Sequence, residues 1–135
     1  MQPIEARIYT PTDIDHTFDV LVREPNSGLL VLPDTFNTVH RAKIIALAAR
    51  HRIPAVYPQR FYATDGGLMA YGADFVELLR LAASYVDRIL RGARPADLPV
   101  QSSSKFELVI NLKTAKALGL EIPPTLLARA DQVIE

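Results

Sequence analysis

Apolar and polar positions along the first half of the chain follow a pattern that predicts strands separated by helices. Residues 4–9 alternate weakly, as in a strand, and a helix capped by Thr12 is expected to follow them. Residues 28–33 form a continuous apolar run, which is typical of a parallel strand covered on both faces. A helix over residues 38–50, starting from its N-cap, and a short buried strand over residues 53–57 complete this part.

The second half predicts one long amphipathic helix between two strands. Residues 68–72 are expected to form a strand, and Asp74 then has the spacing of a capping box at the start of a helix. The apolar stripe of this helix consists of Phe75, Leu79, Ala82, Val86 and Ile89. A polar run at residues 101–104, a strand over residues 106–110 and a short helix capped by Asn111 follow it.

Strands and helices that alternate with short connections are typical of a parallel sheet. The expected fold class is therefore α/β, with a three-layer parallel sheet whose two faces are both covered by helices. The chain has 135 residues, a length that fits one domain, and it contains no internal repeat. Residues 1–135 are expected to form a single α/β domain.

Charge and composition exclude several classes of function. Lys and Arg number 15, as do Asp and Glu, so the chain has no net charge and nucleic-acid binding is not expected. The absence of Cys excludes disulfides, thiolate metal sites and Cys nucleophiles. Nowhere do about 18 apolar residues run together, as a membrane span would require. The first residues also lack the apolar run of a signal peptide, so the chain as written is expected in the cytoplasm.

In open parallel sheets, ligands bind at the carboxyl ends of the strands, where loops lead into helix N-termini. Residues 34–38 combine a carboxylate, two hydroxyls, an amide and an aromatic ring directly after the most apolar strand. Asp34 could hold an ammonium group, while Thr35 and Asn37 could orient a polar ligand. The same residues also suit a helix cap in a solvated turn, and both interpretations are kept.

Aromatic residues near other strand ends form a second candidate group. Their members are Tyr57, Phe61, Tyr62 and Tyr71. These rings could stack on a ligand, and the ordinary alternative is packing beneath a loop.

The sequence contains no template for catalysis or for cofactor binding. It has no GxSxG elbow, no Gly-rich phosphate loop and no GxGxxG fingerprint. Asp13, Asp15 and His16 lie close together at the start of a helix, where the helix dipole already explains acidic residues. No enzymatic activity, catalytic residue, metal or cofactor is therefore expected.

Several strings in the sequence resemble those of one protein family. They are LVLPD at residues 30–34, AARHRIPAVY at 48–57, GGLMAYG at 66–72, KFELVINLKTAKALGL at 105–120 and IPP at 122–124. These strings resemble the substrate-binding proteins of ABC transporters, and among them the proposed tryptophan and tyrosine binders. The resemblance covers nearly the whole chain.

This resemblance implies the fold of a type I periplasmic binding protein, in which two α/β lobes close on a small ligand by a hinge motion. It places residues of the 34–38 loop on the cleft edge of one lobe and further site residues at the next strand end and near the crossover between the lobes. The expected ligand-binding residues are Asp34, Thr35, Asn37, Tyr57, Tyr71 and Gly72.

A full member of that family carries a signal peptide and an amino-terminal lobe before the point that matches Ile4. The chain is therefore expected to be the carboxyl-terminal part of a two-lobe protein. The resemblance implies that the full-length parent is periplasmic and delivers a small polar or amino-acid-like ligand to the membrane subunits of an ABC importer. The alternative is an intracellular ligand-sensing or interaction domain that reuses the same fold.

The missing lobe leads to one more expectation. The helix over residues 74–91 and the strand over residues 106–110 carry apolar faces that would have packed on absent partners. Exposed apolar faces and open sheet edges favour association. A dimer or a higher oligomer of this chain is expected, formed by exchange of elements between copies.

Overall fold

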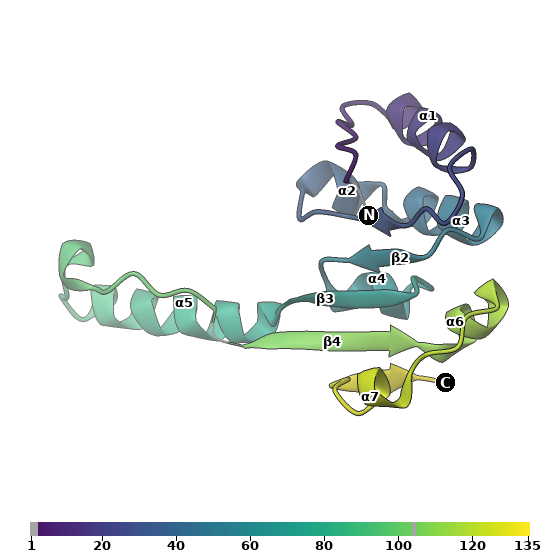
Figure 1. The fold of residues 1–135 in the computed structure, drawn as a ribbon. Helices are drawn as coiled ribbons and strands as arrows, with labels where there is room; N and C mark the ends of the chain where they lie inside the picture. Colours follow the sequence, from purple (N-terminus) through teal and green to yellow (C-terminus); the bar gives the residue numbers. More distant parts are fainter. Residues whose placement is uncertain (1–2, 104) are drawn as a thin grey trace.

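The chain folds into a five-stranded sheet with helices packed on it and a long arm that projects from one edge (Figure 1). This computed structural model describes residues 3–103 and 105–135. Met1, Gln2 and Ser104 lie outside the described residues, so the polar run predicted at residues 101–104 is described only in part.

The strands follow one another across the sheet in the order β1-β2-β3-β4-β5. Their bounds are Leu29–Leu30 for β1, Ala55–Tyr57 for β2, Met69–Ala73 for β3, Phe106–Asn111 for β4 and Gln132–Ile134 for β5. All neighbouring strands are parallel except β3 and β4, which are antiparallel. The α/β class is confirmed, but the sheet is mixed and not wholly parallel. The reason is that the chain leaves β3, runs through the arm and returns beside β3 in the opposite direction.

Seven α-helices are found in the described residues, together with a 3₁₀ turn at Pro95–Asp97. The helices are α1 (Pro11–Leu21), α2 (Thr35–Val39), α3 (Arg41–His51), α4 (Arg60–Thr64), α5 (Phe75–Leu90), α6 (Leu112–Leu118) and α7 (Pro124–Leu127).

The hydrophobic core lies on one face of the sheet. The strand register places Leu29, Ala55, Tyr57, Ala70 and Val109 on this face. Buried side chains of α1, α3 and α4 pack against it, and α4 contacts β2, β3 and β4. Burial of these apolar side chains supplies most of the driving force for folding.

The opposite face of the sheet is open over β1 and over the arm ends of β3 and β4. Leu30 is 67% exposed and Tyr71 is 58% exposed, and Phe106, on the same face, is also exposed. The prediction that helices cover both faces is therefore not met in this region. The helix that follows β3 does not return to cover this face, because it continues outward as the arm (Figure 1).

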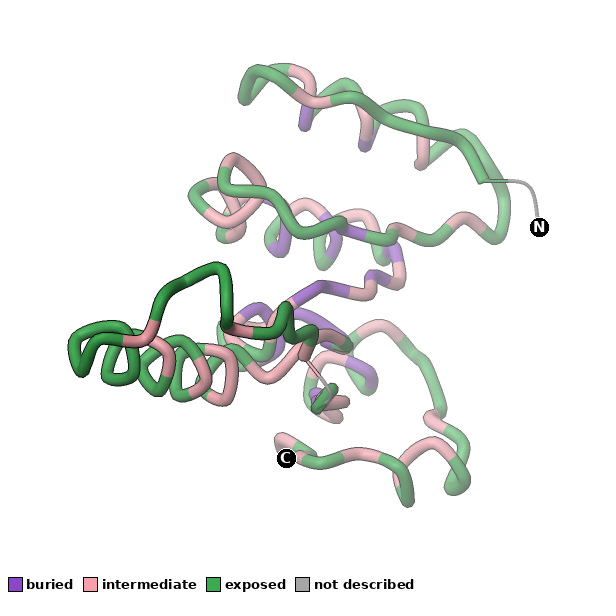
Figure 2. The backbone as a smooth tube through the Cα atoms, turned by 90° about the vertical axis from the view of Figure 1, so that its left-hand side faces the viewer, coloured by how far each residue is buried: buried purple, intermediate pink, exposed green. Residues whose placement is uncertain are grey.

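The arm consists of α5 and the chain that returns from it towards β4. Asp74 caps α5 as predicted, and its Oδ1 accepts hydrogen bonds from the N–H groups of Val76 (3.0 Å) and Glu77 (3.1 Å). The phenol of Tyr85 donates to the Pro99 carbonyl of the returning segment. None of the residues of α5 is buried, and Figure 2 shows the arm as exposed and partly exposed backbone.

Residues 4–9 are not a strand in the structure, in contrast to the prediction. No other strand of the described chain lies beside them, and a strand needs a neighbour for its backbone hydrogen bonds. The helix that follows begins two residues earlier than expected, with Thr10 in place of Thr12 as its N-cap. Asp13 accepts hydrogen bonds from the backbone N–H groups of Tyr9 and Thr10, which lower the pKa of its carboxyl group.

The helix predicted to begin at Thr38 is interrupted and starts earlier. Asp34 caps the short helix α2, and a break at His40 separates it from α3. Thr38 instead lies inside α2, where its Oγ1 donates to the Asp34 carbonyl at 2.9 Å. The carboxylate of Asp34 provides the stronger cap because it satisfies two backbone N–H groups.

Candidate ligand-binding site

The carboxyl ends of β1, β2 and β3 meet at the edge of the sheet from which the arm projects (Figure 1). The amino end of β4 reaches the same edge, because β4 is antiparallel to β3. Loops and helix N-termini cluster at such an edge, and small ligands bind there in open α/β sheets. This edge is the candidate site.

The β1–α2 loop contributes a preorganised polar group. Oδ1 of Asp34 accepts hydrogen bonds from the N–H of Phe36 (2.7 Å) and of Asn37 (3.3 Å). The side-chain amide of Asn37 donates to the Leu32 carbonyl at 3.3 Å. Asp34 and Thr35 are exposed, and Asn37 is half-buried. These hydrogen bonds hold the loop, while Asp34 and Thr35 stay exposed to solvent.

The two carboxylate oxygens of Asp34 have different surroundings. Oδ1 accepts the hydrogen bonds of the helix cap, while Oδ2 has no hydrogen-bond or ion-pair partner among the described residues. The interpretation of Asp34 as a helix cap is confirmed, and its role in ligand binding stays a prediction. A free carboxylate oxygen on an exposed, rigid loop suits a ligand that carries an ammonium group.

Tyr57 and Tyr62 lie beneath this edge in the core. Their rings stack with centroids 5.0 Å apart, and burial raises the pKa of both phenols. Tyr62 is 0% exposed, and its hydroxyl has no hydrogen-bond partner among the described residues. The nearby side chains of Thr38 and Arg41 act in the opposite direction to burial on the Tyr62 pKa. Tyr57 supports the edge from below and does not reach its surface.

Tyr71 and Gly72 lie on opposite sides of β3. Tyr71 is on the open face, where its ring stacks on Phe106 of β4 with centroids 5.8 Å apart. Gly72 faces the other way, and a Cβ on it would overlap the carbonyl oxygen of Pro58, directly after β2. Sequence reasoning missed Phe106, because its position beside Tyr71 follows from the antiparallel register of β4.

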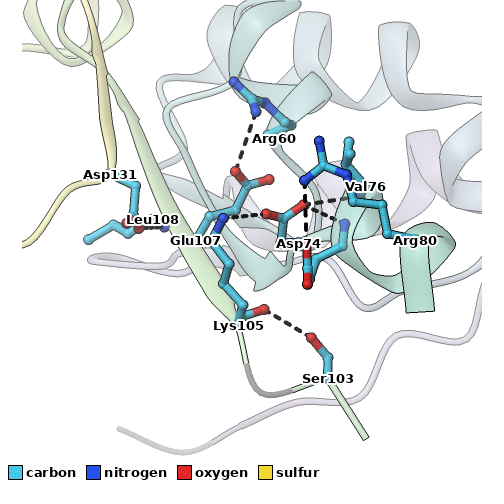
Figure 3. A network of polar contacts seen from close by, with 10 residues as sticks. Arg60, Asp74, Val76, Arg80, Ser103, Lys105, Glu107, Leu108 and Asp131 are labelled. Carbon is cyan, nitrogen blue, oxygen red and sulfur yellow. Dashed lines mark hydrogen bonds and ion pairs between the residues drawn. The ribbon is translucent and has the colours of Figure 1, made fainter. Parts of the chain in front are cut away.

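A charged network at the same edge was also missed. Asp74 pairs with Lys105 at 2.8 Å and Arg60 pairs with Glu107 at 3.5 Å. Figure 3 shows both pairs. These residues are far apart in the sequence and carry no motif, so only the fold brings them together.

A hollow at the surface and a void in the core both lie away from this edge. A hollow of about 410 Å³ lies beside the amino ends of β1 and β2, between the ends of α1 and α3. A void of about 10 Å³ lies in the core beneath Tyr57. The exposed residues of the candidate site line neither of them.

Within residues 3–103 and 105–135, no three His, Cys, Asp or Glu side chains lie together in a way that could hold a metal ion. No helix in that part of the chain combines the length and the apolar character needed to cross a membrane.

Comparisons with known proteins place the chain among binding proteins. Residues 2–134 match the model of the family described as ABC transporter substrate binding protein. The Tyrosine-binding protein of Clostridioides difficile (strain R20291) is 25% identical over 119 residues, which are 87% of this chain and 34% of that protein.

Two solved structures also superpose closely on this chain. The ABC domain in complex with L-Trp from Streptococcus pneumonia superposes with a TM-score of 0.82 and 28% identity, covering 91% of this chain and 41% of that one. A conserved domain protein from Vibrio cholerae O1 biovar eltor str. N16961 gives a TM-score of 0.80 and 28% identity, covering 90% and 41%. The chain thus spans well under half of the length of these proteins.

Proposed function

The chain belongs to the ABC transporter substrate binding protein family, and from this premise we propose that it forms one wall of a site for a small amino-acid-like ligand. The resemblance seen in the sequence is confirmed by this match. The family is one of binding proteins and not of enzymes. The proposed role is therefore capture of a ligand without chemical change to it.

The observation that carries this proposal is the geometry of Asp34. Its Oδ1 is fixed by two backbone N–H groups, and its Oδ2 has no partner among the described residues, at an exposed position on the site edge. A carboxylate fixed in this way can pair with an ammonium group without losing side-chain freedom on binding. Thr35 and Asn37 add hydroxyl and amide groups for the polar atoms of the same ligand.

Aromatic amino acids are the ligand class that we favour. The stacked pair of Tyr71 and Phe106 offers an exposed aromatic surface at the arm end of β3 and β4. One strand separates β1 from β3, so the axes of these two strands lie about 10 Å apart in the sheet. The relatives support this choice, since one is named for tyrosine binding and another was solved with L-Trp. Tyr57 and Gly72 act in this proposal by supporting the edge.

The experiment that tests the proposal is a titration of the ¹⁵N-labelled chain with L-tryptophan and L-tyrosine, followed by NMR. We expect amide shifts at Asp34–Asn37 and at Tyr71–Gly72. Asp34→Asn keeps an N-cap residue but removes the charge, so it should weaken binding roughly tenfold or more, because a hydrogen bond to a charged group contributes about 1.5–3 kcal/mol. Its free energy of unfolding should stay close to that of the wild type.

Asp19→Asn is the matched control, because it removes an exposed carboxylate of α1 away from the site edge. This variant should bind as the wild type does. Shifts confined to the hollow near His51 and Pro54, or equal binding by the Asp34 and Asp19 variants, would remove Asp34 from the site.

The transport role is proposed for a protein that carries this chain together with the remainder of the fold. The relatives are longer than this chain, which covers 34% of the tyrosine-binding protein and 41% of the tryptophan complex. Such a protein would hold its ligand between this wall and a second one, and would deliver it to the membrane subunits of an ABC importer. The site of that protein's action would be outside the cytoplasmic membrane.

We also propose that the chain self-associates. The arm presents Phe75, Leu79 and Val86 as an exposed apolar stripe, and the open face of the sheet adds Leu30 and Phe106. Contiguous exposed apolar surface of this kind favours association in water. A second copy that covers the stripe would remove it from solvent.

A further inference from the structure

The base of the arm is the place where its direction is set. None of the residues of α5 is buried, so no apolar packing onto the sheet holds this helix along its length. The chain enters the arm at Asp74 and comes back to the sheet at Lys105, directly before β4. Within residues 3–103 and 105–135, the angle between the arm and the sheet is therefore set by contacts near these two residues.

Asp74 makes contacts of three kinds at this point. Its Oδ1 caps α5, and its Oδ2 pairs with Nζ of Lys105 at 2.8 Å. Its backbone N–H also donates to the Lys105 carbonyl at 3.0 Å. One residue thus connects the first turn of the helix, the end of β3 and the start of β4.

A second ion pair stands directly beside the first on β4. Glu107 lies two residues after Lys105, and its Oε2 is 3.5 Å from Nη1 of Arg60 at the start of α4. The same guanidinium donates through Nη2 to Oε1 of Gln132 on β5 at 2.6 Å. Figure 3 shows the two ion pairs as neighbours at the start of β4.

The carboxylates of this network are well shielded from water. The side chain of Asp74 is 14% exposed and that of Glu107 is 13% exposed. In the other ion pairs of the described residues, the carboxylates are 38–74% exposed. Their cationic partners Lys105 and Arg60 are more exposed, so each pair joins a shielded carboxylate to a cation at the surface. Loss of the cation would leave the shielded carboxylate unpaired.

We propose that Asp74 and Lys105 form a latch that fixes the direction in which the arm leaves the sheet, with the Arg60–Glu107 pair as its support. The proposal concerns the orientation of α5, and it differs from a simple helix cap because a cap needs only Oδ1 of Asp74. It does not depend on ligand binding.

Both charges of the latch are stable near neutral pH. The hydrogen bond from Lys105 lowers the pKa of Asp74, and the hydrogen bond to Asp74 raises the pKa of Lys105. The carboxylates of Glu77 and Glu107 face the same ammonium group and act on its pKa in the same direction. The latch is therefore closed under ordinary conditions.

The test measures the distance between the arm and the sheet with spin labels. The chain has no Cys, so Ala46→Cys on α3 and Ser84→Cys on α5 give labels at two chosen places only. Both positions are exposed. Labelled chain diluted in an excess of unlabelled chain reports distances within one copy, and pulsed dipolar spectroscopy gives their distribution.

Two substitutions remove the latch and keep the cap. Lys105→Met leaves Asp74 untouched, and Asp74→Asn keeps a good N-cap residue without the negative charge. Each should broaden or displace the distance distribution while circular dichroism shows unchanged helix content. Arg91→Gln removes the exposed pair with Asp87 at the far end of α5 and should leave the distribution as in the wild type.

A distribution that stays the same in both latch variants would overturn the proposal, and so would equal broadening in Arg91→Gln. No ligand is added in this experiment. Its result therefore bears on the latch alone, while the amino-acid titration bears on the binding site alone.

Discussion

Gly72 is the residue that sets how closely β3 approaches the segment after β2. The position of its missing Cβ is filled by the carbonyl oxygen of Pro58, which belongs to backbone and cannot rotate away. From the sequence, Gly72 is expected at the ligand site near a crossover. Its place in the structure adds a packing reason for glycine at this position.

Gly72→Ala should therefore destabilise the chain. Steric overlap of a new methyl group with backbone costs about 1–3 kcal/mol of the free energy of unfolding, and a loss of this size is expected in urea denaturation. Gly28→Ala is the matched control, because the nearest atom to its Cβ would be the Pro54 carbonyl oxygen at 3.4 Å, an ordinary contact. Wild-type stability of the Gly72 variant would show that β3 can move away from Pro58 at no cost.

At this scale, residues whose role is local could be predicted from the sequence. Asp34 was expected either to cap a helix or to bind a ligand, and its cap is seen because it involves only the next three residues. The burial of Tyr57 agrees with the prediction of a short buried strand over residues 53–57. The pairing of Tyr71 with Phe106 could not be predicted in the same way, because it depends on which strands lie side by side, and local pattern does not contain that information.

Among the elements, α5 and α6 follow their local signals. The predicted caps Asp74 and Asn111 both accept backbone hydrogen bonds, and α6 ends at Gly119 in the left-handed conformation. Residues 4–9 and the direction of β4 could not be predicted, because a strand is defined by its neighbours. The C-terminus of α3 is a further exception, since Arg52 adopts a left-handed conformation with φ 54° where glycine is usual.

Replacing Arg52 by Gly should stabilise α3. The left-handed conformation is strained for a residue with a Cβ, and we expect Arg52→Gly to raise the free energy of unfolding by about 0.5–1 kcal/mol. The Arg52 side chain has no hydrogen bond or ion pair among the described residues, so little is lost with it. Chemical denaturation measures the change.

Arg50→Gly provides the comparison inside the same helix. Glycine in a helix interior is unfavourable by about 1 kcal/mol, so this variant should be less stable than the wild type. A loss of stability in both variants would indicate that the Arg52 side chain has a role that its contacts do not reveal.

At the scale of the whole molecule, the placement of the helices around the sheet is the feature that differs most from the prediction. The prediction of helices on both faces assumed that each helix returns to the sheet from which it came. In the structure α5 instead runs outward from the sheet (Figure 1). The side chains of Leu30, Tyr71 and Phe106 on the face that it leaves are exposed. The relatives are more than twice as long as the part that this chain matches, so the comparison with them covers one portion of a larger fold.

The exposed stripe of α5 predicts a change in oligomeric state on substitution. Leu79 lies in the middle of the stripe and is 60% exposed, so Leu79→Glu should leave the helix intact and shift sedimentation velocity from a dimer or larger species towards the monomer. Arg88→Gln, on α5 but outside the stripe, should sediment as the wild type does. A wild-type chain that is already monomeric at micromolar concentration would contradict self-association, whatever the variants do.

The antiparallel pairing of β3 and β4 has a consequence for how such proteins can diverge. The chain leaves the sheet at Asp74 and rejoins it at Lys105, and a backbone hydrogen bond of 3.0 Å joins these two residues. Everything between them is thus an insertion whose two ends meet, and exchange of such a segment leaves the register of the surrounding strands unchanged. Recombination between homologues that exchanged only this segment would therefore replace the arm as one unit and leave the five strands in place.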